Sequence, residues 1–262
     1  MILNQPAIDN GKKFEWGNIS EDYARFRDIY PPEFYSRITE KGLCTRRQKV
    51  LDIGTGTGVL PFNLYKYGAD FTGIDIDDNQ IAQARKMAAE LKMNINFEVS
   101  SAETADYPCN TFDVITACQC YIYFDYEKAA PRFAEMLKDG GRLVLLWMAW
   151  LPFEDKIAME SEKLILKYNP DWTGCHAKIA PIEVPDAVYR YFDRDFSEEY
   201  TLPVHFTRES WHGRMKACRG TGASMSAEVL EKWENEHKAF LETQSEEFDV
   251  AHYAGVLILK KK

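Results

Sequence analysis

The first 150 residues alternate between two patterns of apolar positions. Short apolar runs predict buried strands over 49–53, 70–76, 95–99, 112–118 and 142–148. Apolar residues at helical spacing predict helices between these runs, over 59–67, 78–93 and 126–137. Strands that alternate with helices of this length form βαβ units, so we expect a parallel sheet with right-handed crossovers.

The stretch 78–93 shows the helical pattern most clearly. The side chains expected on its buried face are Ile81, Ala84, Ala88 and Leu91. Asp77 or Asp78 stands at its start, where a carboxylate can accept hydrogen bonds from the first N–H groups. This stretch is therefore predicted to be an amphipathic helix lying on the sheet.

The rest of the chain is less regular. A helix is expected over 32–43 behind a Pro-Pro pair, and further helices over 153–168, 208–218 and 227–243. Residues 169–185, with three prolines and one glycine, predict a loop, and 198–206 and 250–259 predict strands. Because the last two helices lie between two strands, we interpret them as an insertion over the sheet rather than a separate domain.

Composition narrows the possible functions. The chain has 262 residues, 45% hydrophobic and 28% charged, as in an ordinary globular protein, and its net charge of −9 argues against a nucleic-acid partner. No apolar run reaches about 18 residues, and residues 1–13 lack an apolar signal core, so we expect a cytoplasmic protein without membrane contact. The six scattered cysteines predict no metal site. The oligomeric state stays open.

The strongest chemical signal is a glycine-rich turn after the first strand. Gly54, Gly56 and Gly58 alternate directly behind the apolar run that contains Asp52. Glycines permit positive φ and carry no Cβ, so a ligand can approach the backbone closely. The second strand ends at Asp75, where a carboxylate can accept hydrogen bonds from both ribose hydroxyls of a nucleoside. The residues therefore predict a nucleoside-binding α/β domain.

The glycine spacing bears on which nucleoside binds. A dinucleotide fingerprint requires a third glycine where this chain has Val59. A lysine-containing phosphate loop is also absent, which disfavours a polyphosphate ligand. A nicotinamide-dependent oxidoreductase remains an alternative, because it would share the fold and the ribose carboxylate.

These motifs resemble the class I S-adenosylmethionine-dependent methyltransferases. The resemblance rests on five segments in the right order. They are Val-Leu-Asp-Ile-Gly-Thr-Gly-Thr-Gly at 50–58, Phe-Thr-Gly-Ile-Asp at 71–75, Ser-Ala-Glu at 101–103, Phe-Asp-Val-Ile-Thr-Ala-Cys-Gln at 112–119 and Leu-Lys-Asp-Gly-Gly-Arg-Leu-Val at 137–144.

The resemblance implies a fold and a division of the chain. It implies a Rossmann-like, seven-stranded, mostly parallel sheet with helices on both faces and an antiparallel last strand. An N-terminal helical lid and a helical insertion before the last strand would complete it. We expect a single domain, with lid helices in 1–45, the cofactor-binding core in 46–150, and substrate-side helices and final strands in 151–262.

The resemblance also assigns cofactor-binding roles. Asp75 would hold the ribose hydroxyls with Ile76 against the adenine, and Ala102 and Glu103 would read the adenine edge. Gly54, Thr55 and Gly56 would run beneath the methionine part, Gly58 would also belong to the cofactor site, and Asp52 would act through the turn or a water. The backbone at Cys118 would receive the amino group, with Gln119 beside it.

A narrower resemblance links two segments to small-molecule methyltransferases of the trans-aconitate type. Residues 117–125, Ala-Cys-Gln-Cys-Tyr-Ile-Tyr-Phe-Asp, form one of them. The other contains Tyr23, Arg27, Tyr30 and a following proline, and would fold over the cofactor. Ile122 and Tyr123 replace a His-Trp pair of that type, which puts an aconitate-like substrate in doubt.

The expected reaction is methyl transfer from S-adenosylmethionine to a small-molecule acceptor. Aromatic and basic side chains outside the matched motifs are the candidates for acceptor binding. They are Tyr30, Tyr123, Trp147, Trp150, Trp211, Arg214 and Arg219. No catalytic base stands out, and only His212 and Tyr121 are candidates. A noncatalytic S-adenosylmethionine-binding protein is a further alternative.

Overall fold

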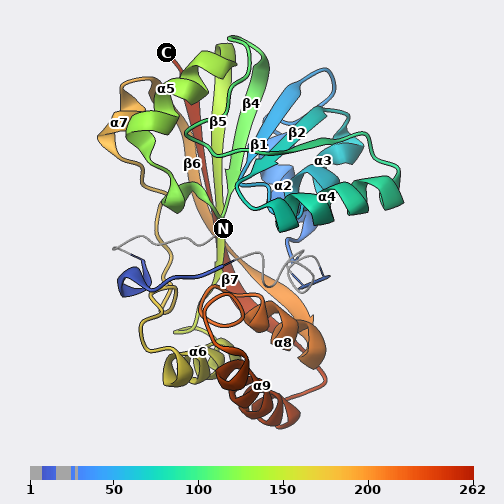
Figure 1. Ribbon diagram of the computed structural model, residues 1–262, viewed down its shortest axis with the longest axis vertical. Helices are drawn as coiled ribbons and strands as arrows, with labels where there is room; N and C mark the ends of the chain where they lie inside the picture. The colour runs from blue at the N-terminus through green and yellow to red at the C-terminus, as the bar shows by residue number, and fades with distance from the viewer. Residues whose placement is uncertain (1–7, 16–24, 27–28) are drawn as a thin grey trace. The chain divides into compact units, whose positions relative to one another are not determined.

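The computed structural model describes residues 8–15, 25–26 and 29–262 and contains a seven-stranded sheet in the order β3-β2-β1-β4-β5-β7-β6 (Figure 1). The strands are β1 (Lys49–Ile53), β2 (Asp70–Asp75), β3 (Asn96–Val99), β4 (Phe112–Cys118), β5 (Leu137–Trp150), β6 (Phe192–Thr207) and β7 (Glu247–Lys261). Neighbouring strands from β3 to β5 pair in parallel, and the last strand is antiparallel. The Rossmann-like sheet expected from the sequence is confirmed.

Helices connect the strands in the expected alternation. They are α2 (Pro32–Thr39), α3 (Val59–Leu64), α4 (Asp78–Leu91), α5 (Tyr126–Met136), α6 (Lys156–Tyr168), α7 (Asp186–Tyr189), α8 (Arg208–Lys216) and α9 (Ala227–Glu242), with single 3-10 turns η1 (Asp9–Gly11), η3 (Tyr65–Tyr67) and η4 (Tyr121–Tyr123). In Figure 1, α5 and α7 lie on one side of the sheet and α2, α3 and α4 on the other. The predicted helical insertion is present as α8 and α9, between β6 and β7.

The chain divides into two compact units. One contains the described residues up to Ile29 with 149–179 and 201–253, and the other contains 30–148, 180–200 and 254–262. Three of the boundaries fall within β5, β6 and β7, and the other two fall outside the helices and strands, after residues 29 and 179. The single methyltransferase domain with the segments 1–45, 46–150 and 151–262 stays a prediction.

The core of the unit that contains β1 is built on the strands and α5. Leu51 and Ile53 of β1, Ile115 of β4 and Phe133 of α5 are at most 1% exposed and belong to one apolar cluster. Four consecutive residues of β1 are buried because helices cover both faces of the sheet, which explains its unbroken apolar run. The cluster fixes the strand ends from which the turn at 54–58 starts.

The other unit packs α6, α8 and α9 together. Trp211 of α8 and Trp233 of α9 are fully buried, and the indole N–H of Trp211 donates to the Ser161 hydroxyl of α6 at 3.0 Å. Ser226 caps α9, and Thr207 forms a reciprocal cap with Ser210 at the start of α8. The helices of the insertion therefore have their own apolar contacts.

Several predicted boundaries differ from the observed ones. The helix after the Pro-Pro pair ends at Thr39, not at residue 43. The fifth strand starts at Leu137, not at residue 142, because Leu137 already pairs with Phe112 and the next four residues bulge from the ladder. Leu91, predicted on the buried face of α4, is 52% exposed, since the helix ends there.

Across the described residues, no helix combines the length and apolar character needed to cross a bilayer. The cytoplasmic location stays a prediction from the sequence.

Candidate functional site

The turn at 54–58 leaves β1 with three glycines in the left-handed region. The φ angles of Gly54, Gly56 and Gly58 are +63°, +57° and +86°, which glycine adopts without a steric penalty. A Cβ at Gly54 would lie 2.6 Å from the Cys120 sulfur. The Thr55 N–H donates to the Ile74 carbonyl at 2.9 Å and ties the turn to β2. The turn is therefore held closely between β2 and the segment after β4.

Asp75 ends β2 beside this turn. Its Oδ2 accepts the Gly56 N–H at 2.9 Å and its Oδ1 accepts the Asp77 N–H at 3.0 Å. Burial raises the pKa of Asp75, and these two N–H groups oppose the rise. A carboxylate has about four acceptor positions, so each oxygen retains capacity for one more donor. Asp75 can thus accept the two hydroxyls of a ribose while keeping its hold on the turn.

Asp52 lies deeper, within β1. Its side chain is 2% exposed, and burial raises its pKa to about 7. The Thr116 hydroxyl donates to it at 2.6 Å. Sequence reasoning missed Thr116, although it is a polar residue in an apolar strand and pairs in register with Asp52. Asp52 therefore supports the strand that carries the turn.

The end of β4 reaches the turn from the other side. Gln119 adopts a φ of +65°, uncommon for a residue with a Cβ. Its N–H donates to the Leu146 carbonyl at 2.9 Å, and its side-chain Nε2 donates to the Met148 carbonyl at 2.6 Å. The Cys120 thiol lies 3.0 Å from the Ile53 carbonyl. These contacts fix the backbone at Cys118 and Gln119 next to Gly54.

The segment expected to contact adenine follows β3. The Ser100 N–H donates to the Asp75 carbonyl at 2.9 Å, so this segment starts beside Asp75. Ile76 is half-buried, whereas Ala102 is 5% exposed and belongs to the core. Glu103 accepts the Asp125 N–H at 3.0 Å, directly before α5. The structure thus brings the predicted adenine residues to the same edge of the sheet.

Aromatic candidates for acceptor binding also lie near the end of β4. The Cys118 thiol lies 3.8 Å from the Tyr30 hydroxyl, and the Tyr30 ring stacks on Phe34 with centroids 4.5 Å apart. Tyr121 packs edge-on against Trp147 at 5.7 Å. Tyr123 donates its N–H to the Cys120 carbonyl at 2.9 Å. Tyr23 and Arg27 lie outside the described residues.

The remaining candidates for acceptor binding belong to the other unit, and their side chains already contact partners within the protein. Trp150 donates to the Glu162 carboxylate at 2.6 Å, packs against Trp211, and carries the Arg214 guanidinium 4.9 Å above its ring. Arg219 forms an ion pair with Asp9 at 2.7 Å, with both side chains at most 11% exposed. The buried carboxylate of Glu162 was not anticipated, because nothing in its local sequence distinguishes it from the other acidic residues of α6.

The surroundings of the candidate base His212 are also closed. Its Nδ1 lies 2.9 Å from His237 Nδ1, and its ring stacks on Trp233 with centroids 5.3 Å apart. The Glu234 carboxylate lies 3.8 Å from its Nε2. Burial lowers the pKa of His212 below its ordinary value of 6.5. His212 is therefore neutral at pH 7 and shares a buried contact with a second histidine.

Comparisons with known proteins relate part of the chain to methyltransferases. Residues 50–141 match the family described as a methyltransferase domain. A ubiquinone biosynthesis O-methyltransferase of Coxiella burnetii is 30% identical over 149 residues, which cover 55% of this chain and 64% of that protein. A phosphoethanolamine N-methyltransferase of Arabidopsis thaliana is 37% identical over 100 residues, which cover 37% of this chain and 20% of that protein. The chain thus spans less than two thirds of the length of these relatives.

A solved structure extends the comparison to most of the chain. The YcgJ protein from Bacillus subtilis superposes with a TM-score of 0.54 at 21% identity and covers 88% of this chain and 98% of its own. At that identity the likeness shows the fold alone. Residues 50–141 therefore match a methyltransferase domain, and the chain shares its Rossmann-like fold with this structural neighbour.

Proposed function

We propose that the protein transfers a methyl group from S-adenosylmethionine to a small-molecule acceptor by in-line displacement and releases S-adenosylhomocysteine. The observation that carries this proposal is the turn at 54–58 held on the Asp75 carboxylate. A single side chain there fixes the turn through Gly56 and keeps two acceptor positions for a ribose. No side chain stands on the three glycines to block a ligand that approaches the backbone.

The other binding roles follow from the resemblance and fit the observed placement. Gly54, Thr55, Gly56 and Gly58 would lie beneath the methionine part, and the fixed backbone at Cys118 and Gln119 would receive its amino group. The adenine-facing residues would be Ile76, Ala102 and Glu103. Tyr23 and Arg27 are proposed to close over the cofactor.

The chemistry asks little of the protein beyond positioning. When bound, S-adenosylmethionine supplies a methyl group that its sulfonium has already activated. The side chains around the end of β4 need only hold an acceptor in line and exclude water, which can contribute ~7–11 kcal/mol. A base is required only for an acceptor that carries a proton at neutral pH. We assign none, and Tyr121 remains the candidate in the same unit as the turn.

A small molecule is the acceptor that the observations favour. The net charge of −9 suits neither nucleic acid nor another polyanion. Tyr30, Tyr123 and Trp147 offer aromatic surface close to the end of β4, and 117–125 resembles the corresponding segment of the trans-aconitate type. The name of one relative gives a small molecule as substrate, phosphoethanolamine, and the name of the other refers to the biosynthesis of a small molecule, ubiquinone. Trp150, Trp211, Arg214 and Arg219 are retained as a second group of proposed acceptor residues.

The alternatives are a nicotinamide-dependent oxidoreductase and a noncatalytic S-adenosylmethionine-binding protein. Thermal unfolding with S-adenosylhomocysteine, S-adenosylmethionine or NAD separates the first alternative. A ligand at 100 times its dissociation constant stabilises by ~2.7 kcal/mol, which is roughly 5–10 °C for a chain of this size. We expect that shift with both adenosyl compounds and none with NAD.

A shift with NAD alone would overturn the proposal in favour of the oxidoreductase. The second alternative is tested by incubating the protein with methyl-labelled S-adenosylmethionine and a panel of small carboxylates, phenols and amines. Transfer of label to one class identifies the acceptor chemistry. Binding of the cofactor with no transfer to any class would favour a noncatalytic role.

A further inference from the structure

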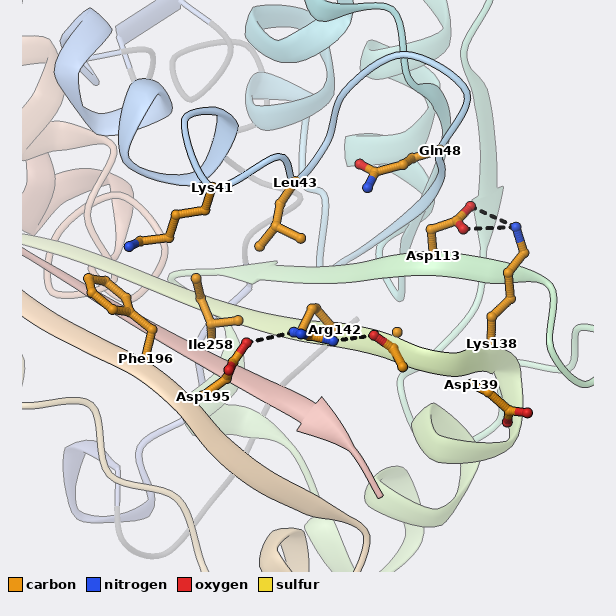
Figure 2. Close-up of a pocket in the computed structure, with 12 residues that line it drawn as sticks. Lys41, Leu43, Gln48, Asp113, Lys138, Asp139, Arg142, Asp195, Phe196 and Ile258 are labelled. Atoms are coloured by element: carbon orange, nitrogen blue, oxygen red, sulfur yellow. Dashed lines mark hydrogen bonds and ion pairs between the residues drawn. The ribbon is translucent and has the colours of Figure 1, made fainter.

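A pocket of about 510 Å³ lies within the unit that contains β1, away from the glycine turn (Figure 2). The bulge in β5 forms one rim, with Gly140 at a φ of +72°. Loop residues Lys41, Leu43 and Gln48 form the facing rim, and Phe196 and Ile258 lie below them on β6 and β7. Bulges of this kind often re-aim side chains next to binding sites.

This pocket is separate from the predicted cofactor site. Asp113 lines it and accepts the N–H of Lys49, the first residue of β1. The glycine turn follows Ile53, the last residue of the same strand. Four steps along a strand span about 13 Å. The two places thus lie at opposite ends of β1.

Two of the three cations in the pocket are already neutralised. Lys138 lies 2.9 and 2.8 Å from the two Asp113 oxygens, and the Arg142 Nε donates to Asp195 at 2.7 Å. Asp139 also lines the pocket, but its side chain is 99% exposed and its carboxylate lies 3.8 Å from the Lys261 ammonium, so solvent and that lysine screen its charge. Figure 2 shows both ion pairs and the Asp139 carboxylate pointing outward.

The third cation has no carboxylate partner in the described part of the chain. The Lys41 ammonium lies 3.3 Å from the centre of the Phe196 ring, and a ring face is its partner there. Arg142 uses one N–H for Asp195 and another for the Gly140 carbonyl. A guanidinium carries five N–H groups, so three remain for a ligand. The pocket therefore presents one ammonium without a carboxylate partner among the described residues, and unused planar donors.

The wall beside Lys41 is apolar. Phe196 is half-buried and provides aromatic surface on that side, next to Leu43 and Ile258, which are 9% and 2% exposed. The volume is in the range of pockets that hold small organic ligands. We propose that this pocket binds a small organic monocarboxylate with an apolar body. Its carboxylate would accept hydrogen bonds from the unused N–H groups of Arg142, the Lys41 ammonium would add positive charge at the rim, and its apolar body would lie against Phe196.

The proposal is tested with phenylacetate as the probe and phenylacetamide as its uncharged counterpart. Titration of the 15N-labelled full chain, followed by NMR, reports the amides of Gly140 and Gly141 in the pocket and those of Gly54 and Gly56 in the turn. We expect saturable shifts at Gly140 and Gly141 with phenylacetate, and binding of phenylacetamide weaker by at least about fivefold. Shifts confined to Gly54 and Gly56 would overturn the proposal.

A matched pair of variants tests the role of the Lys41 ammonium. Lys41→Met keeps an apolar stem and removes the ammonium. Lys66→Met removes another exposed lysine that lies over an aromatic ring, 5.3 Å from the Tyr67 centroid and outside the pocket. We expect phenylacetate to bind Lys41→Met at least about fivefold more weakly and Lys66→Met as well as the unchanged protein. Equal affinity in both variants would contradict the assignment.

Inorganic phosphate tests the apolar part of the proposal. It has the charge but no apolar body, so we expect it to shift Gly140 and Gly141 only at concentrations well above those of phenylacetate. Phosphate that binds as tightly as phenylacetate would show a plain anion site and overturn the assignment to organic carboxylates. This test needs no methyl-transfer activity, so its outcome is independent of the proposed function.

Discussion

Gly54 is subject to two constraints at one position. Its φ of +63° is costly for a residue with a Cβ, and a Cβ there would lie 2.6 Å from the Cys120 sulfur. We predict that Gly54→Ala destabilises the protein by about 2–5 kcal/mol, from a left-handed backbone penalty of about 1–2 kcal/mol and overpacking of about 1–3 kcal/mol. Denaturant unfolding of the variant measures this loss.

The double variant Gly54→Ala with Cys120→Ala separates the two constraints. Removing the sulfur relieves the overpacking but leaves the backbone penalty, so the combined loss should be smaller than the sum of the two single losses. Strict additivity would show that the contact between the turn and Cys120 does not limit position 54.

Single residues of the site were predictable where the chemistry is local. The alternating glycines and Asp75 stand at strand ends that the apolar pattern marks, and the structure places them within one hydrogen bond of each other. The ion pair of Arg219 with Asp9 joins residues 210 positions apart, and no local pattern contains that pairing. The aromatic and basic helix that suggested an anion site therefore could not reveal that one of its arginines already has a buried partner.

At the scale of elements, β1 and β4 were predicted to the residue because both faces of each strand are buried. The start of β5 was not predicted to the residue, because the Asp-Gly-Gly sequence at 139–141 has the composition of a turn that precedes a strand. Leu137 already pairs with Phe112 before this turn, so the strand begins ahead of it. The short helix α7 was missed because four residues carry too little periodicity to register.

The same limit applies to the ends of helices. Asp77, one of the two caps that the sequence allowed, caps α4 by accepting hydrogen bonds from the N–H groups of Asn79 and Gln80. Leu91 has the right spacing for the buried face, but it lies in the last turn. The spacing of apolar residues along one helix predicts which side chains share a face. It does not predict how far the neighbouring strand extends beneath that face.

For the molecule as a whole, buried histidines predict a dependence of stability on pH. Burial lowers the pKa of both His237 and His252 to about 3, from an ordinary value of 6.5, and lowers that of His212 as well. The unfolded chain therefore takes up protons first as the pH falls. The stability that these residues confer is complete above pH 6.5 and is lost as the pH falls toward 3, by up to about 1.4 kcal/mol per pH unit for each histidine.

Asp52 acts in the opposite direction, because its pKa of about 7 makes the folded state the one that binds the proton. Asp75 and Glu162, whose pKa values burial also raises, act in the same direction as Asp52. The large downward pKa shifts of His237 and His252, together with that of His212, outweigh these carboxyl groups, so we expect the net stability to fall between pH 6.5 and 4. The slope should be smaller in His237→Gln and unchanged in His205→Gln, which alters an exposed histidine with a 62% exposed side chain. Urea unfolding at a series of pH values measures both slopes, and equal slopes would contradict the assignment to the buried cluster.

The central claim is that Asp75 and the turn at 54–58 hold an adenosyl cofactor, and calorimetric titration with S-adenosylhomocysteine tests it most directly. Asp75→Ala should weaken binding by more than about 1 kcal/mol through lost charge-assisted hydrogen bonds. Asp75→Asn keeps one acceptor oxygen, so its affinity should lie between those of the unchanged protein and Asp75→Ala. Asp78→Ala, at an exposed carboxylate in the first turn of α4, should bind as the unchanged protein does. Unchanged affinity in a folded Asp75→Ala protein would contradict the account.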